Sequence, residues 1–213
     1  MKAQKKTSTN NERLAEVYRT AAQIILRKGY DATSVNDIAN ALGMTKAGLY
    51  HYISGKKELL FDIMTFGLDE LRDECVNPAS SIKDPIERLH FIITKHAELV
   101  TRGQGVITIL VDEITALSPA QSRKITARKR DYFEKLRNTL IQVKDEGQLQ
   151  DVNVTTAAFC ILGMINWLSR WYRPEGPLTP DQIGEELSKI VLHGLIRPEV
   201  RGRHGLKIVK MDV

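Results

Sequence analysis

The stretch TSVNDIANALGMTKAGLYHY, residues 33–52, decides the fold of this chain, because it predicts two short helices joined by a tight turn. The apolar residues of its first half share the spacing of one helical face and are Val35, Ile38, Ala39 and Leu42. Ser34 can cap this helix, with Asp37 three residues later as an approximate capping box. Gly43 ends it, since glycine readily takes the positive φ found after many helices.

A second helix follows, and its start is slim and basic. Thr45 is placed to cap a helix that begins at Lys46, and Ala47 and Gly48 keep the first turn small. Such a helix start can approach a DNA backbone and enter a major groove. Lys56 then opens a further helix, where an ammonium and free backbone N–H groups suit a phosphate. The alternative interpretation of these residues alone is a helical hairpin that has no partner.

The order of short motifs across residues 12–61 is specific. In sequence they are Lys28-Gly29-Tyr30, Thr33-Ser34-Val35, Ile38-Ala39, Leu42-Gly43, Gly48-Leu49-Tyr50, Tyr52 and Lys56. This segment resembles the DNA-binding domain of the TetR/AcrR family of one-component transcriptional regulators. Ile53 stands where the family usually has Phe, a core change that should not affect recognition.

The resemblance implies roles for individual residues. Those nearest the base edges or the adjoining backbone are Thr45, Lys46, Ala47, Gly48 and His51. Those that hold phosphates are Ser34, Tyr50, Tyr52 and Lys56. It also implies repression of transcription, and a homodimer on a double-stranded operator, since palindromic half-sites mirror a two-fold axis.

The charge distribution agrees with a nucleic-acid partner at this end of the chain. The formal net charge of the 213 residues is +5. Residues 1–60 hold ten Lys or Arg against five Asp or Glu, so the whole excess lies there and the remainder is balanced. A basic excess confined to one domain is typical of an electrostatic DNA footprint.

The hydrophobic periodicity predicts an all-α protein. The expected helices are residues 11–28, 35–42, 46–52, 56–74, 85–102, 106–117, 119–146, 155–172 (with Asp151 as an alternative start) and 181–195. The only stretch with any strand-like alternation is Leu206–Val209. The expected organisation is a disordered basic arm (1–10), a three-helix helix-turn-helix DNA-binding domain (11–58), a helical effector-binding and dimerisation domain (59–197) and a flexible basic tail (198–213).

The last two long helices are predicted to form the dimer interface. Both helices carry more apolar surface than one buried face requires. A four-helix arrangement, with two helices from each of two copies, would cover the remaining apolar surface. The longest apolar run, Ala157–Ile165, is nine residues and too short to cross a bilayer, so we expect no membrane contact. Two distant cysteines and an N-terminus without an apolar core predict a reducing cytoplasm.

An aromatic–arginine cluster lies at the end of the first of these helices: Trp167, Arg170, Trp171 and Arg173. One interpretation makes the tryptophans core or interface anchors and the arginines caps of a helix end. The other makes the cluster a head-group site, where aromatic rings stack on a ligand ring and arginines bind phosphates.

Residues 153–196 resemble, more loosely, the C-terminal part of TetR-type regulators of acyl-CoA, fatty-acid and steroid degradation. This resemblance implies a cavity among the central helices, with apolar lining residues such as Ile107, Leu110, Phe133, Phe159 and Met164. The leading effector is an acyl-CoA thioester that releases the DNA. The alternative is a neutral hydrophobic or drug-like effector.

Catalysis is not expected, and neither a metal nor a cofactor is predicted. The five histidines are scattered, Cys75 and Cys160 form no ligand cluster, and no nucleophile or zinc motif occurs. A purely architectural DNA binder would leave the balanced remainder of the chain unexplained. A lipid-binding or acyl-carrier module would leave the basic N-terminal region without a role.

Overall fold

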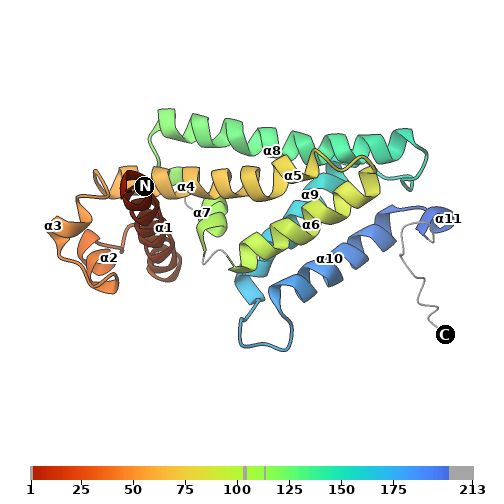
Figure 1. Cartoon of the computed structure of the whole chain (residues 1–213). Coiled ribbons are helices and arrows are strands. Elements are labelled where there is room, and N and C mark those ends of the chain that lie inside the picture. Colours follow the sequence, from red (N-terminus) through yellow and green to blue (C-terminus); the bar gives the residue numbers. More distant parts are fainter. Residues whose placement is uncertain (1, 103–104, 113, 202–213) are drawn as a thin grey trace. The chain divides into compact units, whose positions relative to one another are not determined.

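The computed structural model describes residues 2–102, 105–112 and 114–201, and every regular element among them is a helix (Figure 1). The one β pairing in these ranges is an isolated antiparallel bridge between Leu149 and Ile196. The all-α prediction is therefore confirmed. The stretch with strand-like alternation at 206–209 and most of the predicted tail lie outside the described residues.

The chain divides into two compact units. Unit 1 comprises Met1–Glu70 and Arg102–Arg128, and unit 2 comprises Leu71–Thr101 and Lys129–Val213. The sequence predicted a boundary between residues 58 and 59 and did not indicate that the later segment 102–128 belongs with the N-terminal helices. The reason is packing, because α7 lies against α1.

Unit 1 contains the helix-turn-helix. Its elements are α1 (Lys2–Lys28), α2 (Val35–Ala41), α3 (Lys46–Leu49), α4 (Lys56–Leu71), α7 (Val106–Asp112), the 3₁₀ turn η2 (Ile114–Ala116) and the start of α8 (Pro119–Asp145). α1 begins nine residues before its predicted start and includes most of the predicted arm. No glycine or proline interrupts this stretch, so nothing local ends the helix.

The predicted caps of α2 and α3 are confirmed. The backbone N–H of Asp37 donates to Ser34 Oγ (3.1 Å), and the N–H of Ser34 donates to Asp37 Oδ2 (2.8 Å). These hydrogen bonds, first those from Ser34, lower the pKa of Asp37 to about 2. Gly43 has φ +63°, which a residue with a side chain rarely adopts. Thr45 Oγ1 accepts the N–H of Gly48 (3.0 Å).

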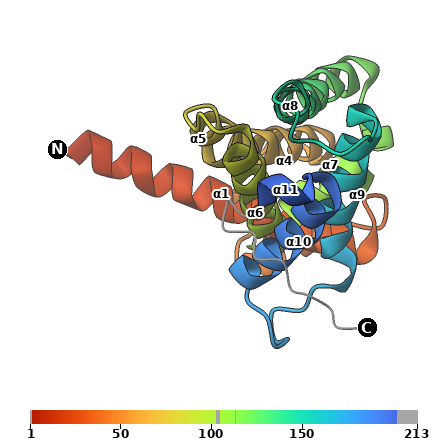
Figure 2. The same ribbon diagram turned by 90° about the vertical axis from the view of Figure 1, so that its right-hand side faces the viewer.

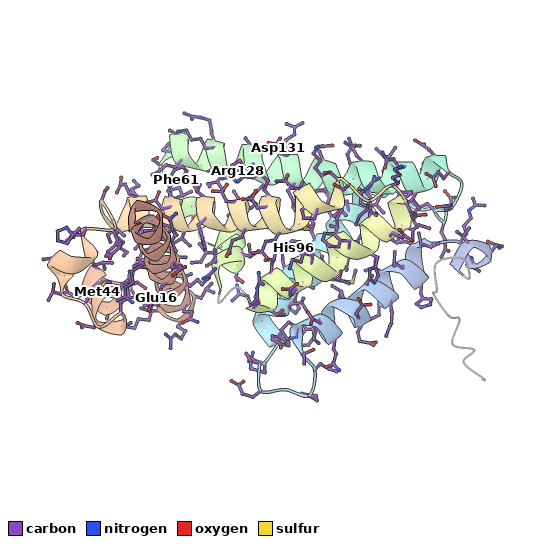
Figure 3. The ribbon with its side chains drawn as sticks, in the orientation of Figure 1. Glu16, Met44, Phe61, His96, Arg128 and Asp131 are labelled. Atoms are coloured by element: carbon purple, nitrogen blue, oxygen red, sulfur yellow. The ribbon has the colours of Figure 1, made fainter. Side chains whose placement is uncertain are left out.

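The far end of α4 is fixed from two sides within unit 1. Arg19 of α1 forms an ion pair with Glu70 (2.7 Å). Arg128, which is labelled on α8 in Figure 3, forms one with Asp69 (2.7 Å). Both pairs are part-buried, which reduces their screening by solvent. Side chains on α1 and α8 thus hold the segment of α4 that leads out of the unit.

Unit 2 contains the remaining helices. They are the π-helical turn η1 (Arg72–Val76), α5 (Asn77–Ala79), α6 (Pro85–Arg102), the rest of α8, α9 (Val154–Trp171), α10 (Pro180–Leu195) and α11 (Pro198–Arg201). α9 and α10 lie side by side (Figure 2). α10 also approaches α6 closely, since a Cβ on Gly184 would lie 3.0 Å from the carbonyl oxygen of Thr94.

The predicted break at residues 77–84 is only partly correct. The chain stays helical from Lys56 to Ala79, because η1 and α5 follow α4 without an extended residue between them. Pro78 lies in α5, directly after the π turn η1. Among the described residues, no helix is both long and apolar enough to span a membrane.

Candidate DNA-binding surface and clefts of the C-terminal unit

The residues predicted to contact DNA gather on one part of unit 1. Ser34, Thr45, Lys46, Ala47, Tyr50 and His51 are exposed, whereas Gly48, Tyr52 and Lys56 are partly buried. They come from the N-cap of α2, from α3 with the residues that follow it, and from the first turn of α4. The caps hold α3 in place, and its outward-facing side chains are exposed to solvent.

Lys56 is held in place by its neighbours. Its Nζ donates to the carbonyl oxygen of Asp31 (3.1 Å) and lies 4.3 Å from the centroid of the Tyr30 ring. An ammonium has three N–H donors, so the bond to Asp31 leaves capacity for a phosphate oxygen. The contacts with Asp31 and Tyr30 therefore fix the position of the Lys56 ammonium.

The predicted effector residues are distributed over both units. Ile107 and Leu110 are buried in unit 1, and the rings of Phe133 and Phe159 in unit 2 lie 4.5 Å apart. Trp167 is 63% exposed and Trp171 51% exposed. Arg170 and Arg173 are also exposed.

A first cleft of unit 2 is formed by η1, α5, α6 and α8, and we call it the α6–α8 cleft. Its volume is about 350 Å³, and its lining residues are Val76, Ala79, Ser80, Arg88, Ile92, Tyr132, Lys135, Asn138, Thr139 and Gln142. None of them was predicted as a site residue. One signal could have found it, because the polar residues of α8 recur with the spacing of one helical face: Lys135, Asn138, Thr139 and Gln142.

A second hollow, the α9–α10 groove, is apolar and measures about 410 Å³. It is lined by Val152, Asn153, Thr156, Ala157, Cys160, Ile161, Met164, Ile190, Val191, Gly194 and Leu195. Ile190 is 64% exposed, and Phe159 on the same helix as Met164 is 62% exposed. Of the predicted effector residues, only Met164 lines either hollow.

A buried polar cluster lies behind the α6–α8 cleft. The Tyr132 hydroxyl lies 2.9 Å from Nδ1 of His96, a residue of α6 that is labelled in Figure 3, and Cys75 Sγ donates to the carbonyl oxygen of Ile92 (3.8 Å). Burial lowers the pKa of His96 to about 4 and raises the pKa of Cys75 to about 12. All three groups are therefore neutral near pH 7. Across the described ranges, no three His, Cys, Asp or Glu side chains are grouped to hold a metal ion.

Comparison with known proteins gives matches along most of the chain. Residues 17–63 match the family model described as bacterial regulatory proteins, tetR family, and residues 83–195 match the tetracyclin repressor-like C-terminal domain. The HTH-type transcriptional repressor KstR2 of Mycobacterium tuberculosis is 29% identical over 192 residues, which cover 89% of this chain and 96% of the relative.

Two solved structures are similar to this chain along most of its length. The structure of ketosteroid transcriptional regulator KstR2 of Mycobacterium tuberculosis has a TM-score of 0.80 at 29% identity, covering 87% of this chain and 95% of that one. AibR in complex with isovaleryl coenzyme A and operator DNA has a TM-score of 0.74 at 36% identity, covering 84% of this chain and 97% of that one.

Proposed function

This chain belongs to the TetR family of transcriptional regulators, and we propose that it represses from a two-fold-symmetric operator until a small-molecule effector releases it. KstR2 is named a transcriptional repressor, and AibR was solved with operator DNA. The observation that carries the proposal is the exposed basic surface around α3, held by the caps at Ser34 and Thr45. We also propose that the protein acts in the cytoplasm, where a bacterial regulator meets its operator.

The DNA contacts proposed for single residues divide into two kinds. Lys46 and His51, with their small neighbours on α3, read base edges or the adjoining backbone. Ser34, Tyr50, Tyr52 and Lys56 hold phosphates, which fixes the register of the protein on the duplex. A lost phosphate contact weakens binding to all sequences similarly and reduces the salt slope by about one.

The test is operator binding at several salt concentrations. Lys56→Met removes the charge and keeps an apolar stem over Tyr30. It should weaken binding and lower the salt slope by about one. Lys124→Met, at an exposed position on α8, is the matched control and should leave the slope unchanged. A slope that Lys56→Met does not alter would exclude Lys56 from the phosphate contacts.

Two copies are proposed to assemble through α9 and α10. The α9–α10 groove and the exposed side chains of Phe159 and Ile190 form an apolar face of the kind that marks a protein interface. One recognition helix covers only a few base pairs, so a two-fold dimer is also what a palindromic operator requires.

The effector is proposed to be an acyl-CoA thioester. The support is the structure of AibR, which was solved with isovaleryl coenzyme A and operator DNA. Of the predicted lining residues, Phe133, Phe159 and Met164 belong to unit 2 and are the candidates there for contact with the acyl chain. Taking a switch from 1:99 to 99:1 requires the ligand to prefer the released state by about 5.5 kcal/mol.

Fluorescence anisotropy of a labelled operator shows which class of compound releases the protein from DNA. Isovaleryl-CoA should lower the anisotropy, whereas isovaleric acid and CoA alone should leave the complex intact. Release by free acids or by neutral hydrophobic compounds, with no response to any thioester, would replace the acyl-CoA proposal with a neutral effector.

A further inference from the structure

The α6–α8 cleft has a lining with two cations and no acidic residue. Its volume of about 350 Å³ is at the lower end of ligand sites, which run from roughly 300 to 1,000 Å³. Val76, Ala79 and Ile92 supply an apolar wall. A cleft of this composition suits one part of a larger ligand, and specifically an anionic part.

Arg88 brings positive charge to the cleft without an acidic partner. Its Nε donates to the carbonyl oxygen of Ile82 (2.9 Å), and its Nη2 donates to Ile82 (2.6 Å) and Lys83 (3.0 Å). Its Nη1 donates to Gln142 Oε1. All these acceptors are neutral, so they fix the guanidinium and do not cancel its charge.

Lys135 is the more available cation. It lies on the polar face of α8, its side chain is exposed, and no ion pair to it occurs among the described residues. An ammonium that lines a cleft beside a fixed guanidinium attracts phosphate strongly, because charge-assisted hydrogen bonds are stronger than neutral ones.

The cleft also touches the segment that continues α4. Val76 belongs to η1, and Cys75 of the same turn donates from Sγ to the carbonyl oxygen of Ile92 (3.8 Å), a residue that lines the cleft. A π turn is rare and is found often at functional sites. A ligand that presses on η1 therefore acts on the C-terminal continuation of the helix that begins at Lys56.

We infer that the α6–α8 cleft binds the phosphate groups of the effector, with Lys135 as the principal contact and Arg88 as a fixed second charge. The inference rests on the proposed function, which supplies the CoA thioester. It moves the phosphates away from the aromatic–arginine cluster on α9, whose residues line neither hollow of unit 2.

The experiment compares two thioesters on the full-length protein bound to labelled operator. Isovaleryl-CoA carries the phosphates, and isovaleryl-N-acetylcysteamine keeps the thioester but lacks them. In Lys135→Gln the concentration of isovaleryl-CoA at half-release should rise about tenfold, while the response to the truncated thioester should not change. Lys135→Arg should keep the wild-type response.

Two controls make the result specific. Lys144→Gln removes an exposed lysine from the last turn of the same helix, outside the cleft, and should match the wild type. Arg170→Gln tests the aromatic–arginine cluster. An effect of Arg170→Gln without one of Lys135→Gln would overturn the inference and leave the proposed function intact.

The remaining outcomes are also decisive. An equal loss of response to both thioesters in Lys135→Gln would mean that Lys135 couples effector binding to DNA release. It would refute phosphate binding in the cleft. A wild-type protein that no thioester releases would refute the acyl-CoA part of the proposed function, and this inference with it.

Discussion

The phenolic oxygen of Tyr132 lies 2.9 Å from Nδ1 of His96, and both side chains are buried. The two rings meet edge to face, with centroids 5.2 Å apart and planes at 86°. This contact joins α8 to α6 within unit 2. Among the described residues, the Tyr132 hydroxyl is the only hydrogen-bond partner of the His96 ring, because Nε2 of that ring has none.

Tyr132→Phe should destabilise the protein by about 1–2 kcal/mol, because it leaves a second buried nitrogen of His96 without a partner. Urea denaturation measures the free energy of unfolding. Tyr50→Phe, at the exposed C-cap position after α3, should change it by less than about 0.5 kcal/mol. Equal stabilities of the two variants would contradict the role assigned to the buried bond.

The stability of the protein should fall between pH 6.5 and pH 4. Burial lowers the pKa of His96 from 6.5 to about 4, so in this window the unfolded chain binds a proton that the folded chain does not. The unfolded state is favoured as the pH falls, by at most about 3 kcal/mol for this group.

The contribution of His96 is isolated by comparing variants across the same pH series. His96→Gln should flatten the slope of unfolding free energy against pH. His51→Gln removes an exposed histidine and should keep the wild-type slope. Parallel slopes for wild type and His96→Gln would show that another group titrates in this window.

Ile190→Glu should convert the proposed dimer to a monomer, because a carboxylate on the α9–α10 groove would be buried without a partner at a cost of roughly 3 kcal/mol. Sedimentation at micromolar concentration measures the assembly. Lys189→Glu, one residue away and exposed, is the control and should remain dimeric. A wild-type monomer that still binds its operator tightly would exclude this interface.

Gly184→Ala should destabilise the protein by about 1–3 kcal/mol, because the new Cβ would lie 3.0 Å from the backbone oxygen of Thr94 and 3.2 Å from its Cα. This outweighs the gain of up to about 1 kcal/mol that alanine usually brings to a helix. Lys189→Ala on the same helix should be nearly neutral. A rise in thermal midpoint for Gly184→Ala would mean that α6 and α10 can separate at this point.

The local parts of the fold were predictable from sequence because their causes are local. Ser34 with Asp37, and Thr45 with Gly48, satisfy backbone groups within three residues, so spacing alone indicates these caps. Long helices such as α6 and α9 were predicted to within about one residue for the same reason, since their apolar faces repeat along one segment.

The parts that sequence reasoning missed depend on distant segments. The residue composition of Arg72–Val76 does not distinguish a π turn from an α-helix, and Pro78 after it suggested a break in the helix. The α6–α8 cleft combines residues near 80, 90 and 135. The polar spacing on α8 indicates one wall of it, but no local pattern connects that wall to the other two segments. The aromatic–arginine cluster was correctly located on one helix, but its exposure follows from how α9 packs.

The two cysteines differ in burial, and this gives the protein a site for selective chemical labelling. Cys75 is enclosed and its thiol pKa is raised to about 12, so almost no thiolate forms there near neutral pH. Cys160 is exposed on the wall of the α9–α10 groove. A maleimide should therefore attach to the unaltered chain at Cys160 alone, and its rate should slow at concentrations where a second copy covers the groove.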